Sequence, residues 1–520
     1  MTVALTVVAS LAVAGAFAAQ LVRWLRVLQR EHYVAASLAR FLGRWTSPQV
    51  GSASSPERRN LRRPLTLSHV LFLGLVVGLL LANPAVLVVD AILYGWLCPT
   101  GLSLRGRTGA LRWTRRSTTI AVVASAMAIA IGLLGALTPQ PWLGAVIVVW
   151  AVPVLLDLAT RLLSPYEDQR AREYVDRAKE RLARVAPTVV GITGSYGKTS
   201  TKNHLAQLLD GSVVASPRSF NNRAGLSRAI NENLGDGTSV FIAEMGTFGP
   251  GEIRSMCDWC PPTIAVVTAI GPVHLERMHS LDVIDAAKFE ITERASVVVL
   301  NVDDVRLRRW IDRLEASGKR VVRAGSTSED ARVRVARDGS QWRVVLDDVE
   351  VLSQPAIVGV QASNLAIAIA TAIELGADAR DVLGRVGGVT AVANRANVAT
   401  APSGVVVIDD TFNANPSSAA AALEILMGLE VTGRRVLVTP GMIELGRDQY
   451  GQNLSLARRA RALDVELVVV GRTNALALAV GYERPPRRFD RREQAVAWVR
   501  ENLVAGDAVL YLNDLPDNYP

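Results

Sequence analysis

The chain has 520 residues and a formal net charge of +9, which is enough length for three domains of ordinary size. The charge is uneven, because residues 1–163 carry 15 arginines against 4 acidic residues, whereas the rest holds 42 basic and 44 acidic residues. That near-neutral remainder lacks the electrostatic footprint that a phosphate backbone requires, so we expect no nucleic-acid partner.

Residues 1–163 are predicted to form a transmembrane region of four to five spans. Residues 2–22 have no charged side chain over 21 positions, about the length that crosses ~30 Å of hydrocarbon. Further apolar runs occupy residues 70–98, 118–137 and 142–160. The last two runs are separated by the turn sequence TPQP, which favours a helical hairpin.

The arginines predict the orientation of these helices, since positively charged loops stay in the cytoplasm. Loop 23–66 carries 9 arginines and segment 105–116 carries 5, so both are expected inside. The run 70–98 must then enter and leave the membrane on its cytoplasmic face, as a hairpin turning at Asn83-Pro84. This gives five passes, or four with a re-entrant loop. We therefore expect a multi-pass protein of the cytoplasmic (inner) membrane, in contact with lipid, whose catalytic domains are cytoplasmic.

Residues 164–186 form a charged stretch that we interpret as a helical linker to the rest of the chain. Further along, Cys257 and Cys260 form a CxxC pair. A zinc site needs a second ligand pair, and none follows at a usual spacing. The alternative is two half-buried thiols at the end of a helix, which we favour.

The segment PTVVGITGSYGKTSTKNHLAQLL (187–209) reads as an apolar strand, a glycine turn and a helix that begins at about Lys198. Backbone N–H groups at such a helix N-terminus bind phosphate, Lys198 reaches the terminal phosphates, and the Thr199 hydroxyl can ligate Mg²⁺. The general GxxxxGK[ST] pattern is not met, because position 192 is Ile. The predicted nucleotide-binding residues of this loop are Gly194, Ser195, Gly197, Lys198, Thr199 and Ser200.

The loop instead matches TG[ST]xGK[TS][ST], and in this it resembles the Mur ligases. The resemblance covers roughly residues 187–520 and is nearest to the members that add D-alanyl-D-alanine to a muramoyl tripeptide. Its motifs follow in the family's order: SFNNRAGLSRAI (219–230), FIAEMGTFGPGEI (241–253), VVTAIGPVHLERMHS (266–280), AAKFEI (286–291), VLNVDD (299–304), NRANV (394–398), VIDDTFNANPSS (407–418) and TPGMIELG (439–446).

Alternating apolar strands and helical segments indicate an α/β fold with parallel sheets. The resemblance implies a P-loop ATPase domain over residues 187–388 and a Rossmann-like C-terminal domain over residues 389–520. It also implies an ATP-dependent amide ligase that transfers the γ-phosphoryl group to a carboxylate acceptor before an amine donor attacks the acyl phosphate.

The middle domain offers two predicted metal ligands besides Thr199. Glu244 ends an apolar strand, where a carboxylate can meet Mg²⁺ between phosphates, although it can also be a helix-capping carboxylate. The resemblance implies that His274 helps to hold a second Mg²⁺. It further implies that Lys288 is carbamylated, a modification that Arg cannot undergo. Glu290 is interpreted as structural.

The resemblance places four further residues at the nucleotide. Arg395 would contact the phosphates on domain closure, Asp410 the ribose or base, with Asn413 nearby, and Asn364 the adenine. With Lys198, Lys288 and His274, Arg395 completes the predicted catalytic set. The family's GDMxELG wording is changed here, since Pro440 and Gly441 stand where Gly and Asp are expected, so the role of that Asp is not carried over.

Peptidoglycan-precursor ligases begin with a small domain that holds the UDP end of the substrate, and the membrane helices occupy its place here. We therefore expect an acceptor at the membrane, in the form of a lipid-linked or peptidoglycan-type cell-envelope precursor. A polymerising ligase of the poly-γ-glutamate-synthase kind is the first alternative. A membrane-coupled ATPase in transport or regulation is the second.

Overall fold

The computed structural model describes residues 3–515 apart from residues 32, 35–36, 39–40, 42–66, 82, 100–101, 103, 105–109, 141, 218–219, 274, 358, 392–396 and 412–413. The chain forms two compact units. The first consists of Met1–Gln169 with Val470–Ala477 and Asp514–Pro520, and the second of Arg170–Val469 with Leu478–Asn513. Most of the predicted loop 23–66 and part of segment 105–116 lie outside the described residues.

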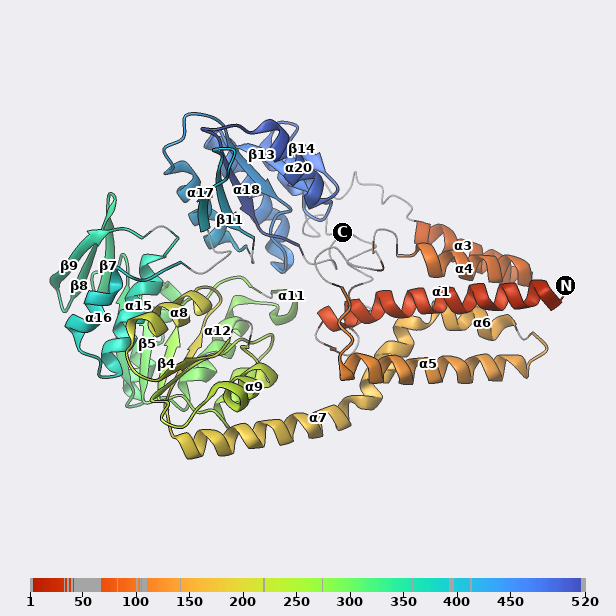
Figure 1. Cartoon of the computed structure of the whole chain (residues 1–520), viewed down its shortest axis with the longest axis horizontal. Coiled ribbons are helices and arrows are strands. Elements are labelled where there is room, and N and C mark those ends of the chain that lie inside the picture. The colour runs from red at the N-terminus through yellow and green to blue at the C-terminus, as the bar shows by residue number, and fades with distance from the viewer. Residues whose placement is uncertain are drawn as a thin grey trace. The chain divides into compact units, whose positions relative to one another are not determined.

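The first unit is helical, and its helices are drawn in red and orange in Figure 1, with the long α7 in golden yellow. Their bounds are α1 (Val3–Arg30), α3 (Leu67–Leu80), α4 (Pro84–Leu97), α5 (Arg115–Ala136), α6 (Trp142–Trp150) and α7 (Val152–Val185), of which α7 continues into the second unit. Two of them, Val7–Arg30 and Arg115–Ala136, are long and apolar enough to cross a membrane. The pair α6–α7, bent by 71°, would make a third if it is one span.

The apolar run 70–98 forms the predicted hairpin, with its turn at Asn83-Pro84. The Asn83 side chain caps α4 by accepting hydrogen bonds from the backbone N–H groups of Ala85 and Val86, and Pro84 occupies the first helical turn. Helices α3 and α4 have 14 residues each, so each is only about 21 Å long. Neither reaches across ~30 Å of hydrocarbon. By length and composition, two helices among the described residues are therefore candidates to cross a membrane, or three if the bent pair is one span, where the sequence predicted four to five spans.

Helix α1 runs past the expected end of the first span, at residue 22, to Arg30. Gln20 and Arg23, on α1, are buried against the C-terminal end of α4. The Gln20 amide donates to the carbonyls of Tyr94 and Cys98, at 3.0 and 2.7 Å, and Arg23 donates to those of Cys98 and Trp96, at 2.7 and 2.9 Å. The Tyr94 carbonyl also accepts from the N–H of Cys98, so the bonds to Trp96 and Cys98 are those that satisfy carbonyls at the end of α4.

The predicted linker 164–186 is not a separate element, because α7 continues through Pro165 to Val185 without a break. The break in this region comes earlier, at Ala151, between α6 and α7. Pro153 lies in the first turn of α7, a position that a proline tolerates because its missing N–H would have no helical acceptor there.

The second unit contains a nine-stranded sheet in the order β2-β3-β1-β4-β5-β6-β7-β8-β9. Pairing is parallel from β2 to β7 and antiparallel from β7 to β9. The strands are β1 (Thr188–Thr193), β2 (Val213–Ala215), β3 (Val240–Glu244), β4 (Ile264–Val267), β5 (Val297–Asn301), β6 (Arg320–Gly325), β7 (Val333–Asp338), β8 (Gln341–Leu346) and β9 (Val349–Pro355).

Apolar cores lie on both faces of this sheet, because neighbouring residues of a strand point to opposite sides. On β1, Val189 belongs to one core and Val190 to the other. Helices α9 (Arg223–Asn233), α10 (Glu252–Cys257), α12 (Leu281–Phe289) and α14 (Ile311–Ala316) contribute to the first core. Helices α8 (Lys198–Leu208), α15 (Ala362–Glu374) and α16 (Ala379–Val386) contribute to the second.

A six-stranded sheet follows, in the order β10-β11-β15-β12-β13-β14. Its strands are β10 (Asn397–Thr400), β11 (Val406–Asp410), β12 (Arg435–Thr439), β13 (Glu466–Val470), β14 (Arg487–Phe489) and β15 (Ala508–Leu512). The helices between them are α17 (Pro416–Met427), α18 (Gln449–Ala462), α19 (Ala475–Tyr482) and α20 (Arg492–Asn502). Strands β11, β15, β12 and β13 are parallel, and β10 is antiparallel.

Candidate active site

The loop between β1 and α8 has the geometry of a phosphate-binding loop. Strand β1 lies between β3 and β4, so its carboxyl end is at a topological switch point, where parallel α/β sheets bind ligands. Gly197 has a φ of +79° and precedes α8, whose N-terminus has no side-chain cap. The first backbone N–H groups of α8 are therefore available for an anion.

The segment that follows β4 holds this loop in place. The Ser195 N–H donates to the carbonyl of Ala269 at 2.7 Å, and the Ser195 hydroxyl bonds to the backbone of Gly271. Gly194 has a φ of +149°, and a Cβ on it would lie 2.0 Å from the Thr268 hydroxyl oxygen. Only glycine fits at this position.

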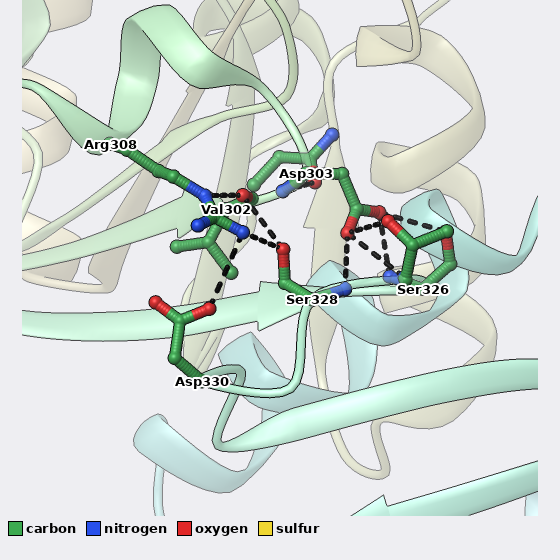
Figure 2. A network of polar contacts seen from close by, with 8 residues as sticks. Val302, Asp303, Arg308, Ser326, Ser328 and Asp330 are labelled. Carbon is green, nitrogen blue, oxygen red and sulfur yellow. Dashed lines mark hydrogen bonds and ion pairs between the residues drawn. The ribbon is translucent and has the colours of Figure 1, made fainter.

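The VLNVDD motif joins that segment to the neighbouring strands. The amide of Asn301 donates to the carbonyl of Thr268 at 2.9 Å, and Asp304 accepts from the N–H of Ile270 at 2.6 Å. Figure 2 shows Asp303 turned toward Ser326. The Asp303 carboxylate accepts hydrogen bonds from the N–H and the hydroxyl of Ser326, at 2.6 and 2.8 Å. Burial by itself would raise the pKa of Asp303, but these bonds and those from residue 327 hold it below its usual value. The motif is therefore a scaffold for the loop.

Lys198 and Thr199 begin α8 at the candidate phosphate site. The Lys198 ammonium donates to the carbonyl of Gly194 at 2.5 Å, which keeps it over the loop. The Thr199 hydroxyl donates to Oε2 of Glu244 at 3.0 Å. Glu244 ends β3 and does not cap a helix with its side chain; its own N–H donates to the hydroxyl of Ser216.

Two further side chains, which the sequence analysis did not assign, contact Glu244. Lys202 donates to Oε2 at 2.9 Å and Asn221 to Oε1 at 3.4 Å. Burial by itself would raise the pKa of Glu244, but the charges of Lys202 and Lys198, together with hydrogen bonds from Lys202 and Thr199, hold that pKa below its usual value. The carboxylate is therefore ionised. A signal for Lys202 was present, since it lies one helical turn after Lys198 in a chain with only five lysines.

The residues present suit magnesium better than a transition metal. Thr199 and Glu244 offer a hydroxyl and a carboxylate oxygen within 3.0 Å of one another. Mg²⁺ prefers such oxygen donors and retains water and phosphate ligands, so it needs few protein ligands. No group of three or more His, Cys, Asp or Glu side chains arranged for a metal occurs among the described residues. His274, the predicted ligand of a second ion, lies outside them.

Lys288 is buried on α12, with 3% of its surface exposed. Burial, reinforced by the charge of Lys198, holds the pKa of Lys288 well below its usual value. Burial therefore favours the uncharged form of its amine. On the same helix end, Glu290 accepts from the N–H groups of Gly251 and Arg254 at 2.6 and 3.0 Å, the structural role expected for it.

Asn364 and Asp410, predicted for the adenine and ribose, line one pocket together. The pocket lies between the phosphate-binding loop and α17, and its lining includes Tyr196, Ser200 and Gln361. The Asn364 amide donates to the side-chain oxygen of Gln361 at 3.0 Å, and this bond orients Asn364. Arg395 and Asn413 lie outside the described residues.

The altered TPGMIELG segment is held by two asparagines. Asn513 donates to the carbonyl of Gly441 at 2.7 Å, and Asn453 accepts from the N–H of Met442 at 2.7 Å. The carbonyl of Glu444 accepts from the N–H of Leu275 at 3.0 Å. This bond links the segment to the residue that follows His274.

The CxxC pair is fully buried, not half-buried as expected. Cys257 and Cys260 have 1% and 0% of their surface exposed and belong to the apolar core of the middle domain. Burial raises the pKa of Cys257 to about 12, which makes its thiolate scarce at neutral pH.

Comparison with known proteins identifies the second unit. Residues 192–372 match the Mur ligase middle domain, and residues 394–512 match the Mur ligase glutamate ligase domain. The UDP-N-acetylmuramoyl-tripeptide--D-alanyl-D-alanine ligase of Mycobacterium tuberculosis is 33% identical over 364 residues, which are 62% of this chain and 69% of that ligase. The ligase of the same name from Bacillus subtilis is 27% identical over 345 residues, 64% of this chain and 74% of its own length.

Among solved structures, the MurF ligase of Thermotoga maritima in complex with ADP has a TM-score of 0.58 and 26% identity, over 66% of this chain and 80% of its own. MurF from Acinetobacter baumannii has the same TM-score at 21% identity, over 66% of this chain and 77% of its own, and shows the same fold. The family predicted from the motifs is confirmed. The chain belongs to the Mur ligase family and is an ATP-dependent ligase.

Proposed function

We propose that the protein is a membrane-tethered Mur ligase that uses ATP and Mg²⁺ to add an amine to the peptide of a cell-envelope precursor held at the membrane. The observation that carries the ligase chemistry is the Thr199–Glu244 pair beside the uncapped N-terminus of α8. A hydroxyl, a carboxylate and the first backbone N–H groups of α8 converge there with Lys198. This is the arrangement that phosphoryl transfer needs, because catalysis of that step is mainly positioning and charge neutralisation.

In the first step, a substrate carboxylate oxygen attacks the γ-phosphorus of ATP, and ADP leaves. The helix N-terminus and Lys198 hold the phosphates, and Arg395 is expected to join them. Mg²⁺ bound by Thr199 and Glu244 would neutralise charge that develops on the phosphate oxygens. In the second step, the amine attacks the acyl carbon, inorganic phosphate leaves with the C–O electron pair, and the amine loses a proton to solvent.

Lys288 is proposed to act as a carbamate. Its neutral amine can add CO₂, with loss of one proton to solvent, and thereby becomes an anion near Lys198. Burial supports this, because it favours the uncharged amine that reacts with CO₂. His274 and Asn413 keep the roles that the resemblance implies, at a second metal ion and beside the nucleotide.

The first 163 residues are proposed to be the tether, with the ligase domains in the cytoplasm. Helix α1, helix α5 and the bent pair α6–α7 give three crossings, and the α3–α4 pair would be a re-entrant hairpin. Three crossings have the parity that the arginines require, with the N-terminus outside. Gln20 and Arg23 donate hydrogen bonds to the carbonyl of Cys98 at the end of α4. These bonds support a re-entrant hairpin within the membrane, because carbonyls without a partner are not tolerated in lipid.

The relatives' names give the substrate class that we propose, a muramoyl-type peptide, with a D-alanyl-D-alanine-like amine as the first donor to test. The family matches begin at residue 192 and the apolar helices precede them, which supports an acceptor delivered at the membrane. Depletion of the protein, followed by mass profiling of envelope precursors, tests this. An unextended precursor should accumulate in the lipid extract, whereas accumulation only of water-soluble UDP-linked peptide would contradict the proposal.

A further inference from the structure

Lys202 is a buried lysine that no step of the proposed reaction uses. It lies on α8, one turn after Lys198, and 2% of its side chain is exposed. Its ammonium lies 2.9 Å from Oε2 of Glu244, whose side chain is 4% exposed. Lysines are almost never buried so completely unless paired. The carboxylate assigned to the metal therefore already has a cation.

The two oxygens of Glu244 differ in what they contact. Oε2 accepts from both Lys202 and Thr199, at 2.9 and 3.0 Å. Among the described residues, Oε1 receives only the long bond of 3.4 Å from Asn221. Oε1 is thus the oxygen left for a metal, and Lys202 fixes the carboxylate so that Oε1 is presented.

The same contact sets an electrostatic condition on metal binding. A divalent ion on Glu244 would lie close to the positive charge of Lys202. Lys198 precedes Thr199, which also bonds to Glu244, so a second positive charge is near. Repulsion between like charges a few ångströms apart is strong where water is excluded. The phosphates of a nucleotide would offset it, because they bring several negative charges to the same place.

On the basis of the function proposed above, we propose that Lys202 is a positioning residue. In the nucleotide-free enzyme its ammonium group neutralises the Glu244 carboxylate in place of the metal ion. It thereby makes tight metal binding depend on bound nucleotide. Metal and nucleotide are then coupled through one side chain. Bound nucleotide raises the affinity for metal by the same factor as bound metal raises the affinity for nucleotide, and removing the charge of Lys202 must reduce that factor.

The test measures Mn²⁺ binding to the full-length protein in detergent, by electron paramagnetic resonance of free Mn²⁺, with and without ADP. Without ADP, Lys202→Met should bind Mn²⁺ at least tenfold more tightly than the parent. The gain in Mn²⁺ affinity that ADP brings should fall at least tenfold. Lys202→Gln, which keeps a donor to Glu244 without the charge, should behave likewise and carries the test if Lys202→Met does not fold.

Controls separate this role from a purely structural one. Lys179→Met removes an exposed lysine and should change nothing. Lys202→Met should lower the melting temperature without metal, and adding Glu244→Gln should restore part of it, since no unpaired charge then remains buried. Unchanged Mn²⁺ affinity in both Lys202 variants, whatever their melting temperatures, would overturn the proposal.

Glu244→Gln also separates this inference from the function on which it rests. This variant should lose Mn²⁺ binding with and without ADP, and retained binding would refute both the metal assignment and the role of Lys202. Loss of binding in Glu244→Gln, together with the expected shifts in the Lys202 variants, supports the proposal even if no acceptor is ever ligated. Failure of ligation alone would count against the proposed function only.

Discussion

The amide oxygen of Asn364 lies 2.3 Å from the point that a Cβ on Gly197 would occupy. The first residue is on α15 and the second ends the phosphate-binding loop, so the loop and the nucleotide pocket are in direct contact. Gly197 also has a left-handed φ of +79°. Both observations require glycine at this position.

Gly197→Ala should therefore lower the affinity for a fluorescent ATP analogue at least tenfold. The added methyl group must displace Asn364, and the left-handed backbone adds about 1–2 kcal/mol of strain. Gly211→Ala is the matched control, because Gly211 has a φ of +83° but its nearest neighbour, the Ser239 hydroxyl, would be 3.8 Å away. Parental affinity in Gly197→Ala would show that the contact does not matter for binding.

Lys288→Ala should lose most of its ADP release and regain part of it when short carboxylates are added to fill the vacated anion site. Lys288→Arg should stay inactive, because a guanidinium keeps its proton and cannot form a carbamate. Lys319→Arg is the control, since Lys319 is bonded to the carbonyl of Ala295 away from the loop. An active Lys288→Arg enzyme would exclude the carbamate.

The buried side chain of His204 should make the free energy of unfolding depend on pH. Burial lowers its pKa to about 4, from an unfolded value of 6.5, and neither ring nitrogen has a hydrogen-bond partner among the described residues. The unfolded state therefore binds the proton first as pH falls. The free energy of unfolding should drop progressively from pH 6.5 to about 4, by on the order of 3 kcal/mol, and this contribution should be constant below that.

Melting temperatures of the parent and of His204→Leu, measured across that pH range, check this dependence. The variant should lose less stability in acid than the parent. Equal slopes in the parent and His204→Leu would contradict a buried neutral imidazole.

Trp113 and Gln140 flank α5 and test the membrane orientation. Cysteine at position 140 should react with an impermeant thiol reagent in intact cells, whereas cysteine at 113 should react only after permeabilisation. The native background is low, because Cys98, Cys257 and Cys260 are all buried. If only the cysteine at 113 is labelled in intact cells, the topology is the reverse of the one proposed. If both cysteines are labelled in intact cells, α5 does not cross the membrane.

The glycine loop, its strand and its helix were predictable because their spacing encodes backbone conformation directly. Gly194 and Gly197 must be glycines for steric reasons that a single sequence displays. Lys202 and Asn221 were not assigned, because they reach Glu244 across the sheet and only the fold brings them together. The lengths of helices α3 and α4 could not be predicted for a similar reason. The sequence predicted a hairpin at 70–98 with its turn at Asn83-Pro84, but not that each of its helices has 14 residues or that Arg23 bonds to the C-terminal end of α4.

The most direct test of the whole account is ADP release by the full-length protein in nanodiscs, measured with and without a lipid-extracted envelope precursor and an amine donor. We predict release only when both substrates are present, none from Lys198→Ala, and a matching mass increase in the lipid fraction. ADP release that does not depend on the acceptor or the amine would identify a transport or regulatory ATPase. Full activity on a water-soluble UDP-linked peptide would contradict the membrane acceptor.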